Sequence, residues 1–485
     1  MADSTSGTWE MQSPQRDAIH RERAFHELDD STTTQEYQQQ PQNSDSRYAS
    51  ASGKRAATLI GQAILQLPIW GFAMTYGIFQ EYYISHWTLS GPSSATGVIG
   101  TTQNGVMYMS MPFLFAVFAR RWARWRRLAS LLGVLLTALS FLLSSFSTSV
   151  SHLIVSQGVF AALGCALVYS PTTLTLGEWF TDARRALAYG VVLSCKNIVG
   201  STCPFLVRHL LDVYGFRVTL RIWAAIAAAS AFGAIYLIPA APPTAASVAG
   251  DVTEANDGSD PHRQRKVPWH FLRHRTFHIY AVATMLQSSG YGIPQTYLPS
   301  YAADITTLST TASTLLLTLF NVPGILSSSF FGYLSDGKRF SLSASTVTCI
   351  AAFSSALSAF LLWGLASSHA SAMPLLTLFS ITFGFFAGGY SATWGGVIDE
   401  LERESRERNE AIDTGVLYGM LNGARGIGYV GGGLAGVPLL KAGVGSGMHG
   451  GAYETEYGPL IVFTGLCSVF GGWSVVWKTW KRFKS

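Results

Sequence analysis

Two positively charged side chains interrupt long apolar segments of the sequence and could bind an anion. Lys196 lies in the middle of VVLSCKNIVGS, and Arg425 lies within LYGMLNGARGIGYVGGG. A charged group in hydrocarbon is costly unless it is paired or hydrated, so both residues are candidates for a functional site. The alternative is a side chain that reaches the interface or pairs with a carbonyl. Lys196 lies roughly ten residues, or ~15 Å, from either end of its segment, which makes that route difficult.

Acidic residues are placed differently from these two cations. The carboxylates lie at the ends of apolar segments rather than near their centres, at Glu81, Glu178, Asp212, Asp304, Asp399 and Glu400. The sequence therefore indicates no proton relay built on a buried carboxylate. A cavity that holds Lys196 without an acidic partner favours an anionic substrate, whose own carboxylate completes the pair. The alternative is a lysine that stays neutral in an apolar site.

Uncharged polar and aromatic residues of the same segments could line a cavity for the substrate. Together with Lys196 and Arg425, the residues predicted to bind substrate are Gln66, Tyr76, Gln103, Asn104, Gln287, Tyr291, Gln295, Asn321, Tyr390, Trp394 and Asn422, with Trp70, Tyr108 and Tyr418 as further lining. Interhelical hydrogen bonds or lipid-facing rings are the alternative for many of them, and at most about half are expected to contact a ligand.

Segments that can cross a bilayer position these residues. The 485 residues are 48% apolar and only 13% charged, and apolar windows recur that suit helices across a bilayer core; such a core is roughly 30 Å thick and needs about 20 residues. We expect an all-α membrane protein of twelve transmembrane helices in two pseudo-symmetric six-helix bundles. The predicted spans are about 56–82, 94–119, 128–147, 152–177, 186–209 and 218–239, then 277–300, 311–334, 341–364, 372–397, 411–439 and 457–478.

An internal repeat supports the division into two bundles. Tyr76-Gly77-Ile78-Phe79-Gln80 recurs as Tyr291-Gly292-Ile293-Pro294-Gln295, an offset of 215 that also relates the charged breaks starting at Arg120 and Ser335. Paired membrane repeats are the architecture of secondary transporters. The predicted domains are a disordered cytosolic tail (1–54), an N-terminal bundle (55–240), a cytosolic linker (241–276), a C-terminal bundle (277–480) and a short cytosolic tail (481–485).

The distribution of Lys and Arg predicts the orientation. With the N-terminus inside, the inner connections carry most of the basic residues, and Arg217 and Lys441 are the exceptions in the outer ones. By the positive-inside rule, both termini are cytosolic in a multi-pass protein, which we place in the cell membrane.

Several other functions are excluded or disfavoured by the sequence. The five cysteines all fall in predicted spans, and no metal-binding spacing, Walker motif or nucleophile–base constellation occurs, so we expect no metal, no cofactor and no enzyme. The net charge of +5 resides in short loops and indicates no nucleic acid. The GxGxxG match at 426–431 lies in an apolar span without a preceding strand. The spacing of His270, His274 and His278 predicts an amphipathic helix on the inner membrane surface.

Glycines within one span favour close packing of a partner helix. Gly415, Gly419 and Gly423 repeat every four residues on one helical face of the span 411–439. Small residues at this spacing let two helix backbones approach each other. Packing is one interpretation, and a flexible element for conformational gating is the other.

Twelve spans, a central linker and charged turns after spans 2 and 8 resemble the major facilitator superfamily. The turn Gly332-Tyr333-Leu334-Ser335-Asp336-Gly337-Lys338-Arg339 is similar to that superfamily's G-x-L-x-D-x-x-x-R/K loop. The resemblance implies that Asp336, Lys338 and Arg339 take part in gating. The corresponding first-half turn, FARRWARWRR from Phe118, keeps the basic end but lacks the aspartate.

Three further stretches resemble the fungal monocarboxylate-transporter-like family: YGIFQEYY from Tyr76, IGTTQNG from Ile99 and GFRVTLRI from Gly215. The resemblance implies alternating access around a cavity between the bundles. Proton-linked animal members of that family carry a lysine on span 1 and an Asp–Arg pair on span 8; this chain has neither, and its span 8 offers Asn321 instead. Fungal members include exporters associated with secondary metabolism and uptake carriers.

The sequence thus predicts a monomeric secondary transporter whose partners are the lipid bilayer and a small molecule, an organic acid or polyketide-like metabolite. Efflux of a secondary metabolite is the favoured function. Uptake of a monocarboxylate or similar nutrient with protons is the first alternative. A non-transporting nutrient receptor is the second.

Overall fold

The structure is a computed structural model that describes residues 52–119, 122–180, 183–240, 269–335, 342–367, 369–443 and 451–484. Its contacts divide the chain into two units, Met1–Ala56 and Ala57–Ser485. The first unit is described only from Ser52, where a helix begins that ends at Ser85. Most of the predicted tail and linker, and the gating residues Asp336, Lys338 and Arg339, lie outside the described residues.

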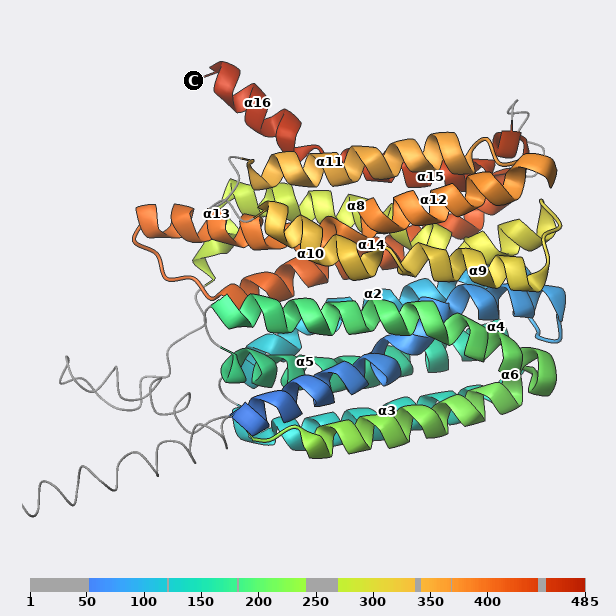
Figure 1. Cartoon of the computed structure of the whole chain (residues 1–485), viewed down its shortest axis with the longest axis horizontal. Coiled ribbons are helices and arrows are strands. Elements are labelled where there is room, and N and C mark those ends of the chain that lie inside the picture. Colours follow the sequence, from blue (N-terminus) through green and yellow to red (C-terminus); the bar gives the residue numbers. More distant parts are fainter. Residues whose placement is uncertain are drawn as a thin grey trace, which may run out of the picture. The chain divides into compact units, whose positions relative to one another are not determined.

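The described part of the second unit is helical, with one isolated bridge between Ser90 and Ser149 in place of any strand. After the helix that ends at Ser85, the first half (57–240) contains α2 (Gly97–Ala119), α3 (Arg126–Ser144), α4 (Val150–Leu153), α5 (Ala161–Trp179) and α6 (Ala183–Leu237). The second half (269–484) contains α8 (Arg275–Asp304), α9 (Thr310–Asn321), α10 (Gly324–Ser335), α11 (Ala344–Leu357), α12 (His369–Gly389), α13 (Trp394–Glu407), α14 (Thr414–Gly443), α15 (Gly458–Gly471) and α16 (Ser474–Lys484). Figure 1 labels these helices.

Eight helices among the described residues are long and apolar enough to cross a membrane. One of them contains two predicted spans, because α6 continues through a kink at Gly215, whose φ of 72° suits glycine. The predicted spans 94–119, 277–300 and 411–439 correspond to α2, α8 and α14, which are not among the eight. The chain therefore has an all-α membrane fold.

Proline divides one predicted span into two helices. The segment predicted at 311–334 consists of α9, which ends at Asn321, and α10, which begins at Gly324, with Pro323 between them. Proline lacks the N–H that would continue the helical hydrogen bonds, so the chain turns at this point. Asn321 thereby comes to lie at a helix end rather than in mid-helix.

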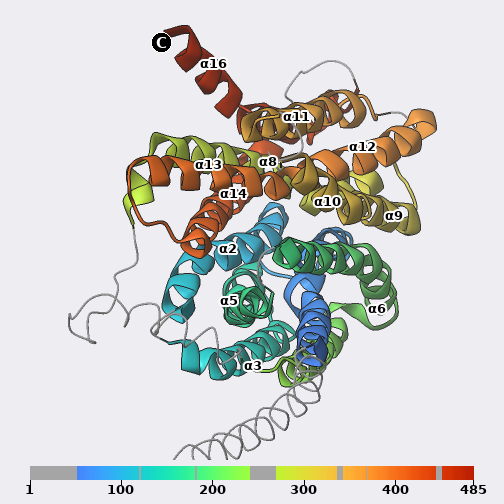
Figure 2. The ribbon, with the colours of Figure 1, turned by 60° about the vertical axis from the view of Figure 1, so that its left-hand side comes forward.

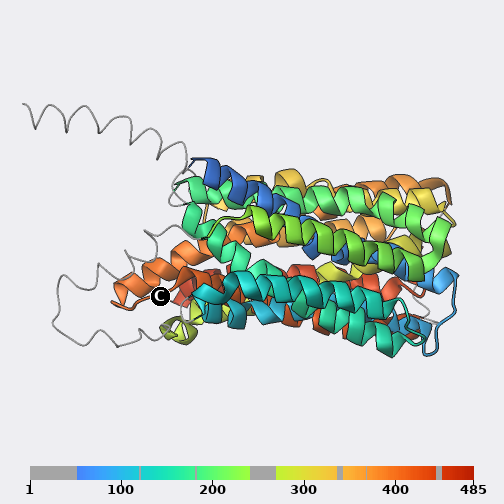
Figure 3. The ribbon, with the colours of Figure 1, turned by 90° about the horizontal axis from the view of Figure 1, so that it is seen from below.

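The two halves pack against each other mainly through α2 and α6 of the first half. α2 packs on α14, and α6 packs on α9 and α10; α2 and α14 lie side by side in Figure 2. The helices of both halves run along a common direction, which is clearest in Figure 3. We call the end with the α2–α3 and α13–α14 connections the basic end, because arginines gather there. The end with the α3–α4 and α8–α9 connections is the opposite end.

An arginine ties three helices together at the basic end. Arg126 at the start of α3 places Nη1 2.8 Å from both carboxylate oxygens of Glu178 on α5. Its Nε donates a hydrogen bond of 2.8 Å to the carbonyl of Phe118 near the end of α2. Glu178 thus supplies the acid that the first-half turn lacks in sequence.

Replacing Arg126 by lysine should lower the melting temperature of the detergent-solubilised protein, because an ammonium cannot bind both carboxylate oxygens and the carbonyl through one planar fork. A loss of about 1–2 kcal/mol is expected for such charge-assisted bonds. The adjacent Arg127, whose guanidinium lies 5.8 Å from the ring of Tyr236, provides the control Arg127→Lys. Equal melting temperatures for the two variants would contradict the role of Arg126.

The prediction of an amphipathic helix carrying three histidines is wrong. His270 lies in a short 3-10 turn, His274 is extended, and α8 begins only at Arg275, so the three side chains share no continuous helical face. His274 is buried instead, with Nε2 2.8 Å from Glu410 and Nδ1 3.4 Å from Glu404. The hydrogen bond with His274 lowers the pKa of the Glu410 carboxyl. These acids come from distant sequence, so spacing could not reveal them.

Candidate functional site

Lys196 lies against an aromatic face rather than beside an acid. α6 positions its Nζ 4.4 Å from the centroid of the Trp70 ring. Trp70 is buried and belongs to the helix that ends at Ser85. It packs on Tyr108 and Tyr169, with centroids 5.3 and 5.9 Å away. Lys196 is half-buried, and a cation–π contact in such a position contributes about 1 kcal/mol.

Arg425 has a similar environment on α14. It is 8% exposed, and its Cζ lies 4.8 Å from the ring centroid of Tyr108 on α2. Tyr291 on α8 and Tyr429 on α14 are each 5.7 Å away. The guanidinium is therefore surrounded by three tyrosine rings that come from both halves of the chain.

The two cations share a continuous aromatic stack. Lys196 contacts Trp70, Trp70 contacts Tyr108, and Tyr108 contacts Arg425. Because Tyr108 belongs to the first half and Arg425 to the second, the stack crosses between the halves. In the part of the chain that the structure describes, neither cation forms an ion pair with a carboxylate. We call Lys196, Trp70, Tyr108 and Arg425 the cation stack.

The cation stack offers hydrogen-bond donors that are not used. Nε1 of Trp70 and Nε of Arg425 are both buried without a partner. Buried polar groups are nearly always hydrogen-bonded, so unused donors at one place indicate a missing acceptor. A carboxylate, which only accepts hydrogen bonds, matches donors of this kind.

Most of the predicted amides instead bond to their own helices. Gln66 donates to Gln62 O at 2.9 Å, Asn104 to Gly100 O at 3.2 Å, and Asn422 to Tyr418 O at 2.9 Å. Each bond joins a side chain to the carbonyl one turn earlier and satisfies part of the amide without a ligand. The structure therefore places these residues within the buried bundle, one helical turn before Trp70, Tyr108 and Arg425.

Other predicted residues are engaged in packing. The hydroxyl of Tyr76 donates to Thr96 O, and that of Tyr390 donates to Gly471 O. Trp394 packs on Tyr418 with centroids 5.9 Å apart. Gln287 and Gln295 are buried on α8, where Ser288 Oγ lies 3.5 Å from Gln287 Oε1. Of the predicted uncharged residues, Tyr291 and the further lining residue Tyr108 have ring contacts to Arg425.

Asn321 is committed to a bond between the halves. Its Nδ2 donates to Gly200 O on α6 at 3.0 Å and to Leu317 O on its own helix at 2.9 Å. Both amide hydrogens are thus used. The two acceptors belong to the backbone, so a ligand would have to displace one of them to reach this nitrogen.

The predicted glycine face meets α2 at two of its three positions. A Cβ at Gly423 would lie 2.7 Å from Cγ of Pro112, and one at Gly419 would lie 3.3 Å from Phe115. Gly415 instead donates its N–H to the carboxylate of Asp413 at 3.0 Å, next to the start of α14. The close approach of α14 to α2 continues beyond the predicted face, to Gly426.

The sequence analysis missed a buried ion pair on the side of the opposite end. Glu81 and Arg208 are 6% and 7% exposed, and Arg208 Nη2 is paired with Glu81 Oε2. Asp212, one turn after Arg208, is 3.7 Å from the same guanidinium. The expectation that Glu81 lies at a span end failed to reveal its burial, because α6 covers it. The sequence did contain a signal for this pair. Glu81 and Arg208 both lie at the outer ends of their predicted spans, so an acid and a base were expected at the same depth.

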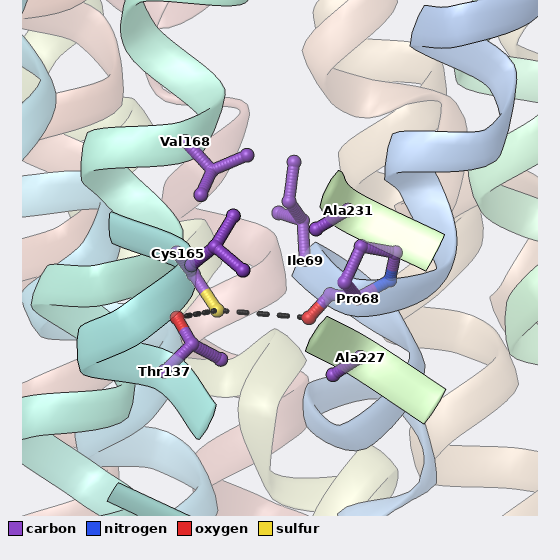
Figure 4. A pocket seen from close by; sticks show the side chains of 8 residues that line it. Pro68, Ile69, Thr137, Cys165, Val168, Ala227 and Ala231 are labelled. Atoms are coloured by element: carbon purple, nitrogen blue, oxygen red, sulfur yellow. Dashed lines mark hydrogen bonds between the residues drawn. The ribbon is translucent and has the colours of Figure 1, made fainter. Parts of the chain in front are cut away.

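A small cavity within the first half is separate from the cation stack. Figure 4 shows it beside Pro68, with Val168, Ala227 and Ala231 in its lining. The thiol of Cys165 lies 3.7 Å from the Pro68 carbonyl and 3.9 Å from the Thr137 hydroxyl. Because its walls are mainly apolar, the cavity suits a packing defect better than a site for a charged ligand.

Two helical halves that meet around two basic side chains are the arrangement expected of a membrane carrier, and comparison with known proteins identifies the family. A model of the Major Facilitator Superfamily matches residues 58–433, and the chain belongs to that superfamily. It is therefore a multi-pass membrane transporter that binds small molecules, and not an enzyme.

Named relatives fall into two groups of transporters. The chain is 24% identical to the MFS-type transporter pynF of Aspergillus niger over 79% of its own length and 80% of the relative's. It is 28% identical to an MFS-type transporter of Gibberella moniliformis over 65% of its length and 70% of the relative's. It is 27% identical to monocarboxylate transporter 12-B of Danio rerio, over 55% of its length and 58% of the relative's.

Proposed function

We propose that this protein is a secondary transporter that exports an acidic organic metabolite by alternating access. The observation that carries the proposal is the cation stack: two basic side chains from different halves, held by aromatic faces and without a carboxylate partner among the described residues. The substrate carboxylate would lie between Lys196 and Arg425. The bundles 55–240 and 277–480, joined by the linker 241–276, would move relative to each other around this site.

The chemistry of the donors supports an anion over a neutral or cationic substrate. The ammonium and guanidinium can only donate, and so can the unpartnered N–H groups of Trp70 and Arg425. A carboxylate gains strong charge-assisted bonds from such groups in a medium of low dielectric. A cationic substrate would be repelled by both charges.

The arginines at one end of the bundle support the orientation. The connections at the basic end contain Arg124, Arg126 and Arg408, and the positive-inside rule assigns this end to the cytosol. Both termini would then be cytosolic, and the opposite end would face the outside of the cell membrane. The protein would act as a monomer, since one chain supplies both halves of the site.

The direction of transport is proposed from the fungal family that the sequence resembles, whose members include exporters associated with secondary metabolism. Two relatives are named as MFS-type transporters, from Aspergillus niger and Gibberella moniliformis. The relative of Danio rerio is named as a monocarboxylate transporter, and its substrate class supports the second candidate, uptake of a monocarboxylate with protons. The third candidate is a nutrient receptor that binds without transport.

A comparison of metabolites tests these candidates. Acidic compounds would be measured inside and outside cells that lack the gene, cells that overexpress it, and cells that overexpress Lys196→Ala. Export predicts an acid that accumulates inside the deletion strain and is released by the wild-type protein but not by the variant. Loss of uptake of an external carboxylate would overturn export in favour of import. No change in any acidic compound would overturn transport of an acid.

A further inference from the structure

We propose that Pro204, Asn321 and Thr318 form a reversible lock that keeps the outer side of the transporter closed. This proposal rests on the orientation given under the proposed function, in which the opposite end faces the outside. It goes beyond that function by naming residues that control which side of the membrane the site faces. The lock uses two backbone carbonyls of α6, and a proline has released one of them, that of Gly200, from its own helix. Side chains of the other half then bind these carbonyls.

Pro204 lies within α6 and changes the hydrogen bonds of the preceding turn. A helical residue donates its N–H to the carbonyl four positions earlier, but proline has no N–H and its ring crowds that carbonyl. The carbonyl that loses its donor is that of Gly200. The next carbonyl, of Ser201, lies four residues before Phe205, which has an N–H to donate within α6, and it keeps a second lone pair for a neighbour.

Both carbonyls accept hydrogen bonds from α9 of the second half. Asn321 Nδ2 donates to Gly200 O at 3.0 Å, and Thr318 Oγ1 donates to Ser201 O at 3.1 Å. Asn321 is 2% exposed and Thr318 is 8% exposed, so the bonds are shielded from water. Leaving such a buried carbonyl without a donor costs about 1–3 kcal/mol, which makes these bonds significant for closure.

Two further bonds extend the same antiparallel pairing of helices. Toward the basic end, Ser194 Oγ donates to Ile325 O at 3.2 Å. Toward the opposite end, Arg208 Nε donates to Thr314 Oγ1 at 3.3 Å, and Glu81 holds the same guanidinium. The ion pair joins two helices of the first half, so it can persist when the halves separate. The hydrogen bond between Arg208 and Thr314 must break when the halves separate, because Thr314 belongs to the second half.

Water makes the lock reversible. When α6 and α9 separate toward the outside, the gap becomes a water-filled vestibule, and water can bind the two carbonyls in place of Asn321 and Thr318. Irregular backbone is tolerated at membrane depth where it lines such a cavity. The carbonyl of Gly200, which its own helix leaves without a donor, is therefore satisfied by Asn321 in the closed state and by water in the open state. An apolar interface between α6 and α9 could not exchange protein hydrogen bonds for water in this way.

A cysteine reporter measures opening without any substrate. Leu317 on α9 is fully buried, and every other buried member of its apolar cluster belongs to the first half. In full-length protein whose five natural cysteines are replaced by serine, Leu317→Cys would be labelled by a membrane-impermeant methanethiosulfonate reagent added outside intact cells. The labelling rate reports the population in which α9 has left α6.

Pro204→Ala and Asn321→Ala are each expected to increase this labelling rate at least fivefold. Pro204→Ala restores the N–H that bonds to the Gly200 carbonyl within α6, so this carbonyl no longer needs Asn321. Asn321→Ala removes the amide that donates to the same carbonyl. Because both act on one bond, the double variant should exceed the faster single variant by less than twofold. Thr202→Ala is the matched control, since Thr202 is exposed and its hydroxyl bonds to Ile198 of its own helix.

Unchanged labelling in both single variants, with normal elution in gel filtration, would overturn the lock. A double variant with multiplied effects would also overturn it, because the residues would then act separately. Labelling that occurs only with reagent supplied from the cytosolic side would overturn the orientation. None of these outcomes depends on a substrate. The labelling experiment can therefore contradict the lock without contradicting anion transport, and a transport assay can contradict anion transport without contradicting the lock.

Discussion

Lys196→Ala should reduce the transport rate at subsaturating substrate by at least about tenfold, because a hydrogen bond to a charged group contributes about 1.5–3 kcal/mol. The amount of protein in the membrane should stay normal, since Lys196 is not part of an ion pair among the described residues and alanine is favourable in a helix. The measurement is initial-rate transport of the acidic compound found by metabolite comparison, normalised to surface protein. Lys441→Ala is the control, as Lys441 is exposed near the end of α14.

The nature of the replacement separates charge from shape. Lys196→Arg keeps a positive charge that can lie over Trp70 and should retain more activity than Lys196→Gln. The same order should appear in the substrate concentration for half-maximal transport. If arginine, glutamine and alanine all left the wild-type rate unchanged, the substrate could not be anchored by Lys196.

Gly426→Ala should destabilise the protein more than the addition of a Cβ at Gly419 or Gly423 would. A Cβ at Gly426 would lie 2.5 Å from the carbonyl oxygen of Gly105 and 2.5 Å from the backbone nitrogen of Met109. These are backbone atoms of α2, so no side-chain rotation can relieve the clash, and α2 and α14 would have to separate. Overpacking of this type costs about 1–3 kcal/mol.

Gly431 supplies the matched control on the same helix. A Cβ there would meet nothing within 4 Å, and Gly431→Ala should stabilise slightly because alanine is the better helix former. In thermal unfolding of detergent-solubilised protein, Gly426→Ala should melt roughly 5 °C lower. Gly431→Ala should melt at or above the wild-type temperature. A normal melting temperature for Gly426→Ala would mean that α2 and α14 do not approach closely in the folded protein.

The fold was largely predictable because its signal is local. Runs of about 20 apolar residues specify helices in a bilayer whatever their partners. The breaks were harder to predict: the span 311–334 divides at Pro323, whereas α6 continues through Gly215 as one kinked element. Whether a helix breaks at Pro323 or continues through Gly215 depends on how the neighbouring helices pack around that residue. The tail and the gating loop with Asp336 remain predictions.

The candidate site was predictable for its cations and less so for its partners. Lys196 and Arg425 are conspicuous in sequence because charge is rare in apolar spans. That their neighbours are Trp70 and Tyr108 depends on the packing of three different helices, which spacing along one segment cannot reveal. Asn321 was placed among substrate-binding residues, and its bond to Gly200 became visible only once α6 and α9 were in contact. The substrate role of these residues remains a prediction.

The cation stack bears on the return of the unloaded carrier. In the transport proposed above, the protein must change its facing direction with the site empty, and two basic side chains without an acidic partner would oppose that step, since dehydrating a charge costs several kcal/mol. The ring faces of Trp70 and Tyr108 would offset part of that cost, by about 1 kcal/mol for each contact. A carrier arranged in this way would return empty more easily, and it would not need to exchange one anion for another.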